Sequence, residues 1–151
     1  MPIKFQPDGY HTATPYLIIR EAARALDFYK AAFGAMELFR LPMPGGKIGH
    51  AEILIGDSHI MLADECPESG ARSPEALGGT SVSLMLYVEN SDAMTERAVA
   101  AGATVVRPIQ NQFYGDRSAT LSDPFGHQWT IATHIEDVSP EEIDRRLAAM
   151  K

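Results

Sequence analysis

The predicted strands and helices of the first half of the chain recur in the same order in the second half, at a nearly constant spacing. Ile19 ends the first predicted strand, and Val88 ends the corresponding strand of the second half. Gly34 and Gly102, each at the end of a predicted helix, are separated by almost the same length of chain as that first pair. A whole order of elements rarely repeats by chance, so the sequence favours a fold built from two copies of one supersecondary unit.

Each half is predicted to contain a strand, a helix and three further strands, because apolar residues alternate in the strands and form a stripe on the helices. The predicted elements of the first half are strand 14–19, helix 22–33 and strands 36–41, 48–55 and 59–63. Those of the second half are strand 81–88, helix 92–101 and strands 104–108, 117–122 and 127–133, the last two joined by a turn at 123–126. The predicted division is a first module at 1–68, a linker at 69–80, a second module at 81–135 and a C-terminal helix at 136–151, all within a single structural domain.

The composition argues against several classes of partner and location. Thirteen basic residues stand against 20 acidic ones, and the net charge of -7 would repel a nucleic-acid backbone. The longest apolar runs, such as residues 84–88, fall far short of the ~20 residues of a membrane helix, and the first nine residues do not resemble a signal peptide. The single cysteine, Cys66, cannot form an internal disulfide. We therefore expect a cytoplasmic protein with neither nucleic acid nor membrane as its partner.

Five short segments carry a resemblance to a known family. They are Thr14-Pro15-Tyr16-Leu17, Phe28-Tyr29-Lys30, Ala51-Glu52-Ile53, Tyr114-Gly115-Asp116-Arg117 and Asp123-Pro124-Phe125-Gly126-His127-Gln128-Trp129. With the repeated element order, they make residues 10–135 similar to the vicinal oxygen chelate superfamily (glyoxalase, bleomycin resistance and extradiol dioxygenase), in its PhnB-like branch. The resemblance implies an α+β fold in which two tandem βαβββ modules form a curved, partly open mixed β barrel with flanking helices. It also implies a homodimer.

In metal-using relatives each module supplies one ligand from its first strand and one from its last. The resemblance places these four positions at Thr14, Met61, Ser83 and Thr130, and one and the same repeat offset relates the two pairs. Hydroxyl groups and a thioether lack the charge and basicity with which carboxylates and imidazoles hold a divalent cation. We therefore expect no cofactor and no tightly bound divalent metal at the family position.

Histidines offer one alternative metal site. If Met61 faces the cavity, strand alternation places His59 on the same face, with Glu52 opposite Met61 and His50 two residues along. These three side chains, His50, Glu52 and His59, could line one wall of the cavity. The competing interpretation is a polar patch on a hydrated sheet surface, which we favour because all three would come from a single hairpin.

The same alternation predicts the lining of a ligand cavity. The predicted ligand-binding residues are Tyr16, Glu52, Met61, Met85, Tyr87, Tyr114, Arg117, Gln128 and Thr130. Aromatic and apolar surface with a few polar groups is typical of a small-molecule site. The alternative is that these strand residues simply fill a core.

Arg117 is predicted to face the cavity together with Ala119 and Leu121, across from Thr130 and Gln128. Its guanidinium could hold a carboxylate or phosphate of a ligand in a bidentate manner. The alternative is a structural ion pair with Glu52 or Asp116.

Three functions are compatible with these patterns. The first is a protein that binds a small, partly apolar molecule, which could be anionic, in the barrel cavity. The second is a lyase, isomerase or dioxygenase of the same superfamily, working with or without a metal. The third is a dimeric structural or regulatory module without a ligand. The missing ligands at the family position favour the first over the second, and the polar cavity residues disfavour the third.

The metal prediction can be tested on the purified protein. Elemental analysis after desalting should find far less than one divalent metal per chain. About one metal per chain, abolished by Thr130→Ala and Met61→Ala, would contradict the transfer of the ligand positions. Metal lost on His59→Ala instead would identify the alternative wall as the site.

Overall fold

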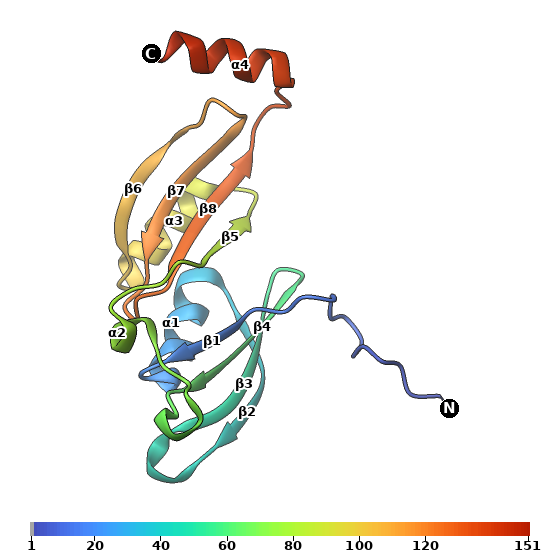
Figure 1. Cartoon of the computed structure of the whole chain (residues 1–151), viewed down its shortest axis with the longest axis vertical. Helices are drawn as coiled ribbons and strands as arrows, with labels where there is room; N and C mark the ends of the chain where they lie inside the picture. Colours follow the sequence, from blue (N-terminus) through green and yellow to red (C-terminus); the bar gives the residue numbers. More distant parts are fainter. Residues whose placement is uncertain (1) are drawn as a thin grey trace. The chain divides into compact units, whose positions relative to one another are not determined.

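The computed structural model describes residues 2–151 and divides into two compact units, with the boundary along the chain between Gly79 and Thr80. Each unit is described by itself. Both contain a four-stranded mixed sheet with a helix packed on one face (Figure 1). The α+β fold with two such sheets and no closed barrel confirms the predicted βαβββ repeat.

The first unit contains one long helix and the four strands of its sheet. Its elements are β1 (Tyr16–Ile19), α1 (Ala22–Phe33), β2 (Met36–Pro42), β3 (Ile48–Ile55) and β4 (Ser58–Asp64), in the sheet order β1-β4-β3-β2. Only the β1–β4 pair of this sheet is parallel. The 3-10 turns at Pro44–Gly46 and Pro67–Ser69 and the short helix α2 (Pro74–Leu77) complete the unit. Helix α2 lies within the segment that was predicted as a linker.

The second unit repeats this arrangement. Its elements are β5 (Ser83–Tyr87), α3 (Ser91–Ala101), β6 (Thr104–Asn111), β7 (Asp116–Ser122) and β8 (Gln128–His134), in the order β5-β8-β7-β6, with β5 parallel to β8. Strand register repeats as well, because Tyr16 pairs with Met61 and their equivalents at the repeat offset, Met85 and Thr130, also pair. The duplication therefore extends from element order to the alignment of individual residues.

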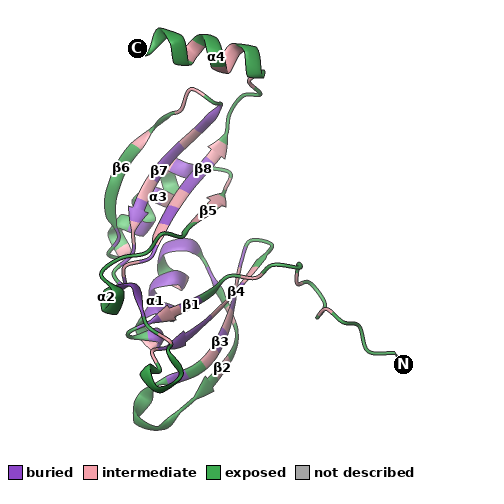
Figure 2. Cartoon of the chain, in the orientation of Figure 1, coloured by how far each residue is buried: buried purple, intermediate pink, exposed green. Residues whose placement is uncertain are grey.

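Helix α1 packs on its sheet through an apolar stripe. Leu26, Tyr29 and Phe33 are buried on the helix, as their spacing predicts. The helix ends at Gly34, whose φ of 68° allows its amide to close the last turn on Lys30 and Tyr29. Figure 2 shows the buried residues concentrated on α1 and on the central strands of each sheet, whereas the edge strands β2 and β6 are largely exposed.

A polar side chain on the last strand of each sheet anchors the start of the helix. The amide of Ala22 donates to Asp64 Oδ1 at 3.0 Å, and the amide of Ser91 donates to Thr133 Oγ1 at 2.9 Å. The two pairs correspond across the repeat, because Ser91 and Thr133 stand at the same offset from Ala22 and Asp64. Both units thus satisfy a free amide at the first turn of the helix from a neighbouring strand. Asp64 makes a second bond, from the amide of Ile48 at 2.6 Å, that Thr133 does not reproduce.

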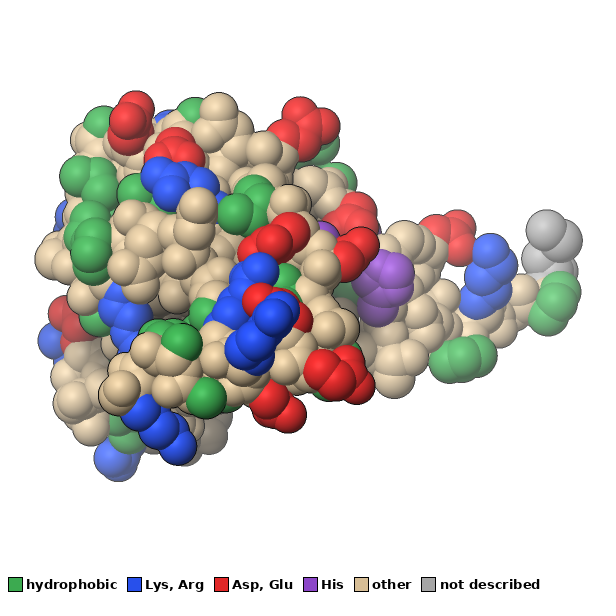
Figure 3. All heavy atoms as spheres, turned by 90° about the horizontal axis from the view of Figure 1, so that it is seen from above, with side chains coloured by type: hydrophobic (Ala, Val, Ile, Leu, Met, Phe, Trp, Pro, Cys, Tyr) green, Lys and Arg blue, Asp and Glu red, His purple; other side chains and the backbone are tan. Residues whose placement is uncertain are grey.

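The C-terminal helix α4 (Pro140–Ala149) begins at Ser139, whose hydroxyl accepts from the amide of Glu142 at 3.2 Å. Arg146 joins it to the preceding segment through an ion pair with Glu136 at 2.7 Å, and it also pairs with Glu142 within the helix at 3.0 Å. Figure 3 shows basic side chains lying among acidic ones on the face that it presents.

Within residues 2–151, no helix is both long enough and apolar enough to span a bilayer.

The helix anchor of the first unit gives a stability prediction. Asp64→Ala should lower the free energy of unfolding by about 2 to 4 kcal/mol, because two buried amides lose their charged acceptor. Asp64→Thr should lose clearly less, since a threonine fills this role at position 133. Chemical denaturation of both variants checks this, with Asp57→Ala in the exposed β3–β4 turn as the control. Equal losses for Ala and Thr would contradict the proposed equivalence.

Candidate functional site on the open face of the first sheet

Each sheet has a face opposite its helix, here called the open face. In the first unit Leu17, Ile19 and Leu62 are buried on the helix side. Tyr16, by contrast, keeps 47% of its surface exposed on the open face. Met61 pairs with Tyr16 on one side and with Glu52 on the other, so these three side chains form a row across β1, β4 and β3. The predicted placement of Glu52 opposite Met61 is thereby confirmed.

A chain of hydrogen bonds joins the polar residues of this face. His50 Nε2 lies 3.0 Å from Glu52 Oε2, and His50 Nδ1 lies 2.8 Å from the hydroxyl of Tyr16. An ionised carboxylate only accepts, so Nε2 carries the proton of the neutral imidazole and Nδ1 accepts from the Tyr16 hydroxyl. Burial raises the pKa of the Tyr16 phenol above its ordinary value. Tyr10 donates a further hydrogen bond to Glu52.

His59 belongs to the same face but not to this chain of bonds. Its ring stacks on Tyr10 with a centroid distance of 3.9 Å, and its Nδ1 atom is buried without a hydrogen-bond partner. The predicted alternative metal set is therefore only partly assembled, because His50 bonds Glu52 while His59 contacts Tyr10. Among residues 2–151, no group of three His, Cys, Asp or Glu side chains is arranged to hold a metal ion.

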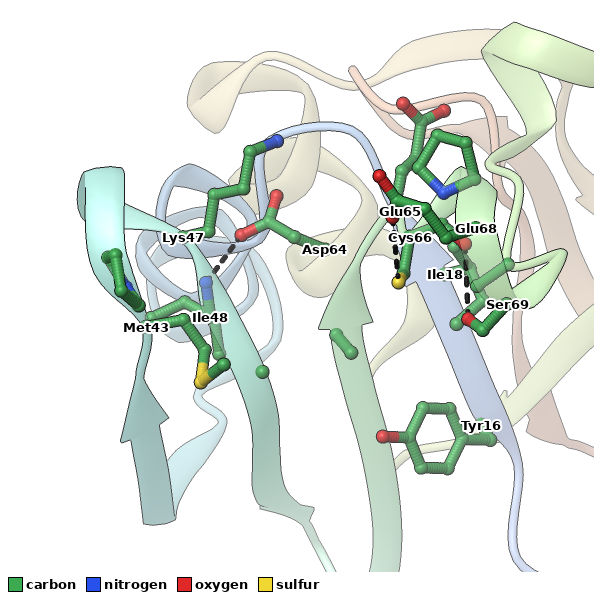
Figure 4. A pocket seen from close by; sticks show the side chains of 15 residues that line it. Tyr16, Ile18, Met43, Lys47, Ile48, Asp64, Glu65, Cys66, Glu68 and Ser69 are labelled. Carbon is green, nitrogen blue, oxygen red and sulfur yellow. Dashed lines mark hydrogen bonds between the residues drawn. The ribbon is translucent and has the colours of Figure 1, made fainter.

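A pocket of about 610 Å³ opens at the end of this face, beside Tyr16. Strand residues form its apolar part, and two loops close its sides. Its lining consists of Tyr16, Ile18, Met43, Pro44, Lys47, Ile48, Gly49, Ala63, Asp64, Glu65, Cys66, Pro67, Glu68, Ser69 and Ala71. Figure 4 shows Tyr16 at one end of the pocket, with its hydroxyl directed away from β1, the strand that carries it. All these residues belong to the first unit.

The acidic residues of the pocket are engaged by the protein itself. Both oxygens of Asp64 accept backbone amides, as described above. Glu65 accepts from the hydroxyl of Ser73 and lies 3.6 Å from Arg20, and the bond from Ser73 is the main reason that the pKa of Glu65 is lowered. The thiol of Cys66 donates to Glu68 at 3.4 Å. Lys47 is the one basic residue of the lining, and no ion pair is found for it within residues 2–151.

The four family ligand positions lie in comparable places in the two units. Met61 and Thr130 occupy the last strands β4 and β8 and point to the open faces. Thr14 precedes β1, and Ser83 is the first residue of β5, where it pairs with Gln128. The hydroxyls of Thr130 and Thr120 are 3.3 Å apart. Of the four side chains, none is a carboxylate or an imidazole.

The remaining predicted site residues of the second unit lie outside this pocket. Tyr87 is 62% exposed, and its hydroxyl donates to Asp116 at 2.8 Å, which is the main reason that the pKa of Tyr87 is raised. The other oxygen of Asp116 bonds His134 at 2.8 Å. Met85 is about half exposed, while Tyr114, in a loop, contacts Phe113 with its ring.

The predicted orientation of Arg117 was wrong. The sequence pattern predicts a turn of four residues at 123–126. In the structure Ser122 pairs with Gln128, so the loop between the two strands has five residues. Thr120, not Ala119, is therefore opposite Thr130. A shift of one residue in register moves every side chain of a strand to the other face.

Arg117 consequently lies on the helix-bearing face and forms a bidentate ion pair with Asp92 of α3. Its Nε and Nη2 atoms lie 2.7 and 2.9 Å from the two carboxylate oxygens. The interpretation as a structural pair is right, but the partner is neither Glu52 nor Asp116. This bond is the main reason that the pKa of Asp92 is lowered. Arg117 therefore leaves the candidate ligand site.

Comparisons with known proteins agree on the family. The model of the Glyoxalase/Bleomycin resistance protein/Dioxygenase superfamily matches residues 10–131. An uncharacterized protein of Mycobacterium bovis is 42% identical over 139 residues, covering 90% of this chain and 91% of that protein. TioX from Micromonospora sp. ML1 superposes with a TM-score of 0.63 at 25% identity, covering 85% of this chain and all of TioX.

A PhnB protein from Bacillus cereus has the same fold, with a TM-score of 0.64 over 82% of this chain and 99% of that structure, at 17% identity. The sequence match and the shared fold point the same way. The repeated βαβββ units described above are thus those of the glyoxalase, bleomycin resistance and dioxygenase superfamily, to which this chain belongs.

Proposed function

We propose that the chain binds a small, partly apolar molecule in the pocket on the open face of the first sheet. The observation that carries this proposal is the pocket itself. Its volume of about 610 Å³ lies within the usual range of small-molecule sites, roughly 300 to 1,000 Å³. Ile18, Met43 and Ile48 supply apolar surface, and polar groups lie around them.

The ammonium group of Lys47, in the pocket lining, favours a ligand with an anionic or hydrogen-bond-accepting end. Asp64 and Glu65 are occupied by bonds within the protein, whereas Lys47 is not. An ammonium group at the rim of a pocket attracts a carboxylate or phosphate through charge-assisted hydrogen bonds. This argument replaces the one from Arg117, whose charge is neutralised by Asp92.

Homodimerisation and a cytoplasmic location stay predictions. Exposed apolar side chains on the edge strands, Met36 and Leu38 of β2 and Val105 and Val106 of β6, are compatible with pairing against a second copy. A dimer that binds no ligand is the third function considered above. A ligand screen in which no compound binds the pocket would favour it.

The pocket can be tested with defined probes. A library of small aromatic and aliphatic carboxylates should contain compounds that raise the melting temperature of the wild-type protein. Ala71→Trp should abolish these shifts, because the indole would occupy the pocket, whereas Ala76→Trp on the exposed side of α2 should leave them unchanged.

The charge preference has its own control. Lys47→Met should weaken carboxylate binding roughly tenfold, in the range for losing one charge-assisted contact, while the matching neutral amides keep their affinity. Lys4→Met serves as the control, since Lys4 pairs with Asp8 outside the pocket. Carboxylates that bind Ala71→Trp as tightly as the wild-type protein would contradict the proposed site.

A further inference from the structure

The hydrogen-bonded chain Glu52–His50–Tyr16 ends at the pocket, because Tyr16 is both its last member and a lining residue. A neutral imidazole beside an ionised carboxylate gives one donor order along the whole chain. Glu52 accepts from His50 Nε2, and His50 Nδ1 accepts from the Tyr16 hydroxyl. In this order the proton of the Tyr16 phenol, a residue of the pocket lining, is already directed at a base. About half of the Tyr16 surface is exposed, so the side chain is within reach of a bound molecule.

The fold does not require this arrangement. In the second unit Met85 corresponds to Tyr16, Thr130 to Met61 and Thr120, opposite Thr130, to Glu52. Ser118, two residues before Thr120, stands where His50 stands in the first unit. The second sheet therefore forms the same topology with none of the three side chains of the relay.

We propose that Tyr16, relayed through His50 to Glu52, is a proton-transfer group acting on the molecule bound in the first-sheet pocket. The inference rests on the pocket proposed above. A proton from an acidic carbon or a hydroxyl of the ligand moves to the phenol oxygen while the Tyr16 proton moves to Nδ1 of His50. The ligand becomes an anion, and the imidazolium formed is stabilised by Glu52.

Return of the proton from Tyr16 to a different ligand atom completes an isomerisation. This outcome requires no oxidant, reductant or second reactant. Histidine suits the acceptor role, because its ordinary pKa lies near neutral pH. Concerted transfer avoids a free tyrosinate, whose formation burial disfavours. Tyr16 is the catalytic residue in this scheme, and Glu52 is a positioning residue.

The activation of Tyr16 can be measured without knowing the ligand. Benzenesulfonyl fluoride reacts with phenols: the oxygen–sulfur bond forms, the sulfur–fluorine bond breaks, fluoride leaves, and a base takes the phenol proton. With His50 as that base, Tyr16 should be labelled about tenfold faster or more than Tyr114, a conservative fraction of what a positioned general base contributes. Tyr114 is the internal comparator, since 39% of its surface is exposed. Peptide mapping by mass spectrometry gives both rates in the wild-type protein.

Variants separate the relay from simple exposure. His50→Phe should slow labelling of Tyr16 about tenfold or more, by removal of the general base, without changing Tyr114. His59→Phe is the matched control, because it keeps the ring stack on Tyr10 and lies outside the relay. Glu52→Gln should slow labelling less than His50→Phe does. The amide oxygen of glutamine still accepts from His50 Nε2, but it stabilises the imidazolium formed less than a carboxylate does, so labelling of Tyr16 should slow while that of Tyr114 stays unchanged.

Two results would overturn the inference: Tyr16 labelled no faster than Tyr114 in the wild-type protein, or a rate at Tyr16 unaffected by His50→Phe. The first needs no variant and so holds even if His50→Phe fails to fold. Neither result depends on ligand binding. An activated Tyr16 in a protein that binds no library compound would therefore count against the pocket proposal alone. Binding with an inert Tyr16 would count against the relay alone.

Discussion

The Asp64 carboxylate connects three elements of the first unit, and the site depends on it. It stands at the end of β4, accepts the amide of Ala22 at the start of α1 and accepts the amide of Ile48 at the start of β3. The side chain of Glu21, which precedes α1, makes no capping bond, so Asp64 supplies the acceptor that the helix start would otherwise lack. Because Ile48 lies two residues before His50, the same contact fixes the start of the strand that carries the relay. The carboxylate also lines the pocket, so one buried charge holds the scaffold and shapes the site.

The two units share their topology and register but differ on their open faces. In the first unit Tyr16 and His50 meet across β4 and lead to a pocket. In the second unit Tyr87 donates to Asp116, Asp116 also bonds His134, and His134 bonds Asp137, whose side chain is exposed. A duplicated scaffold leaves one copy free to change while the other preserves stability. Both units carry a polar network, but only that of the first unit includes a residue of the pocket described above.

The sequence predicted the fold well because its signal is repeated: strand alternation, helix stripes and a constant offset all agree. Placement of polar side chains was less predictable. The orientation of Arg117 was predicted wrongly because one extra residue in the loop before β8 turns the side chains of the strand to the other face. Its partner Asp92 was missed because it lies on a helix, whose position the strand pattern does not indicate. The Tyr16–His50 bond joins strands that are not neighbours, so no pairing rule indicates it. Tyr10 lies outside every predicted element, and only the folded structure brings it to Glu52.

The donor order of the relay is the most direct test of the account. Nitrogen-15 NMR of uniformly labelled protein distinguishes the two imidazole tautomers through the chemical shifts of the ring nitrogens and their couplings to the ring protons, and His50→Phe assigns the signals by their loss. Neutral His50 should carry its proton on Nε2, with Nδ1 shifted as a hydrogen-bond acceptor, and Tyr16→Phe should move the Nδ1 signal toward that of a free acceptor nitrogen. A proton on Nδ1, or an Nδ1 shift indifferent to Tyr16→Phe, would contradict a relay that runs from the pocket through Tyr16 and His50 to Glu52.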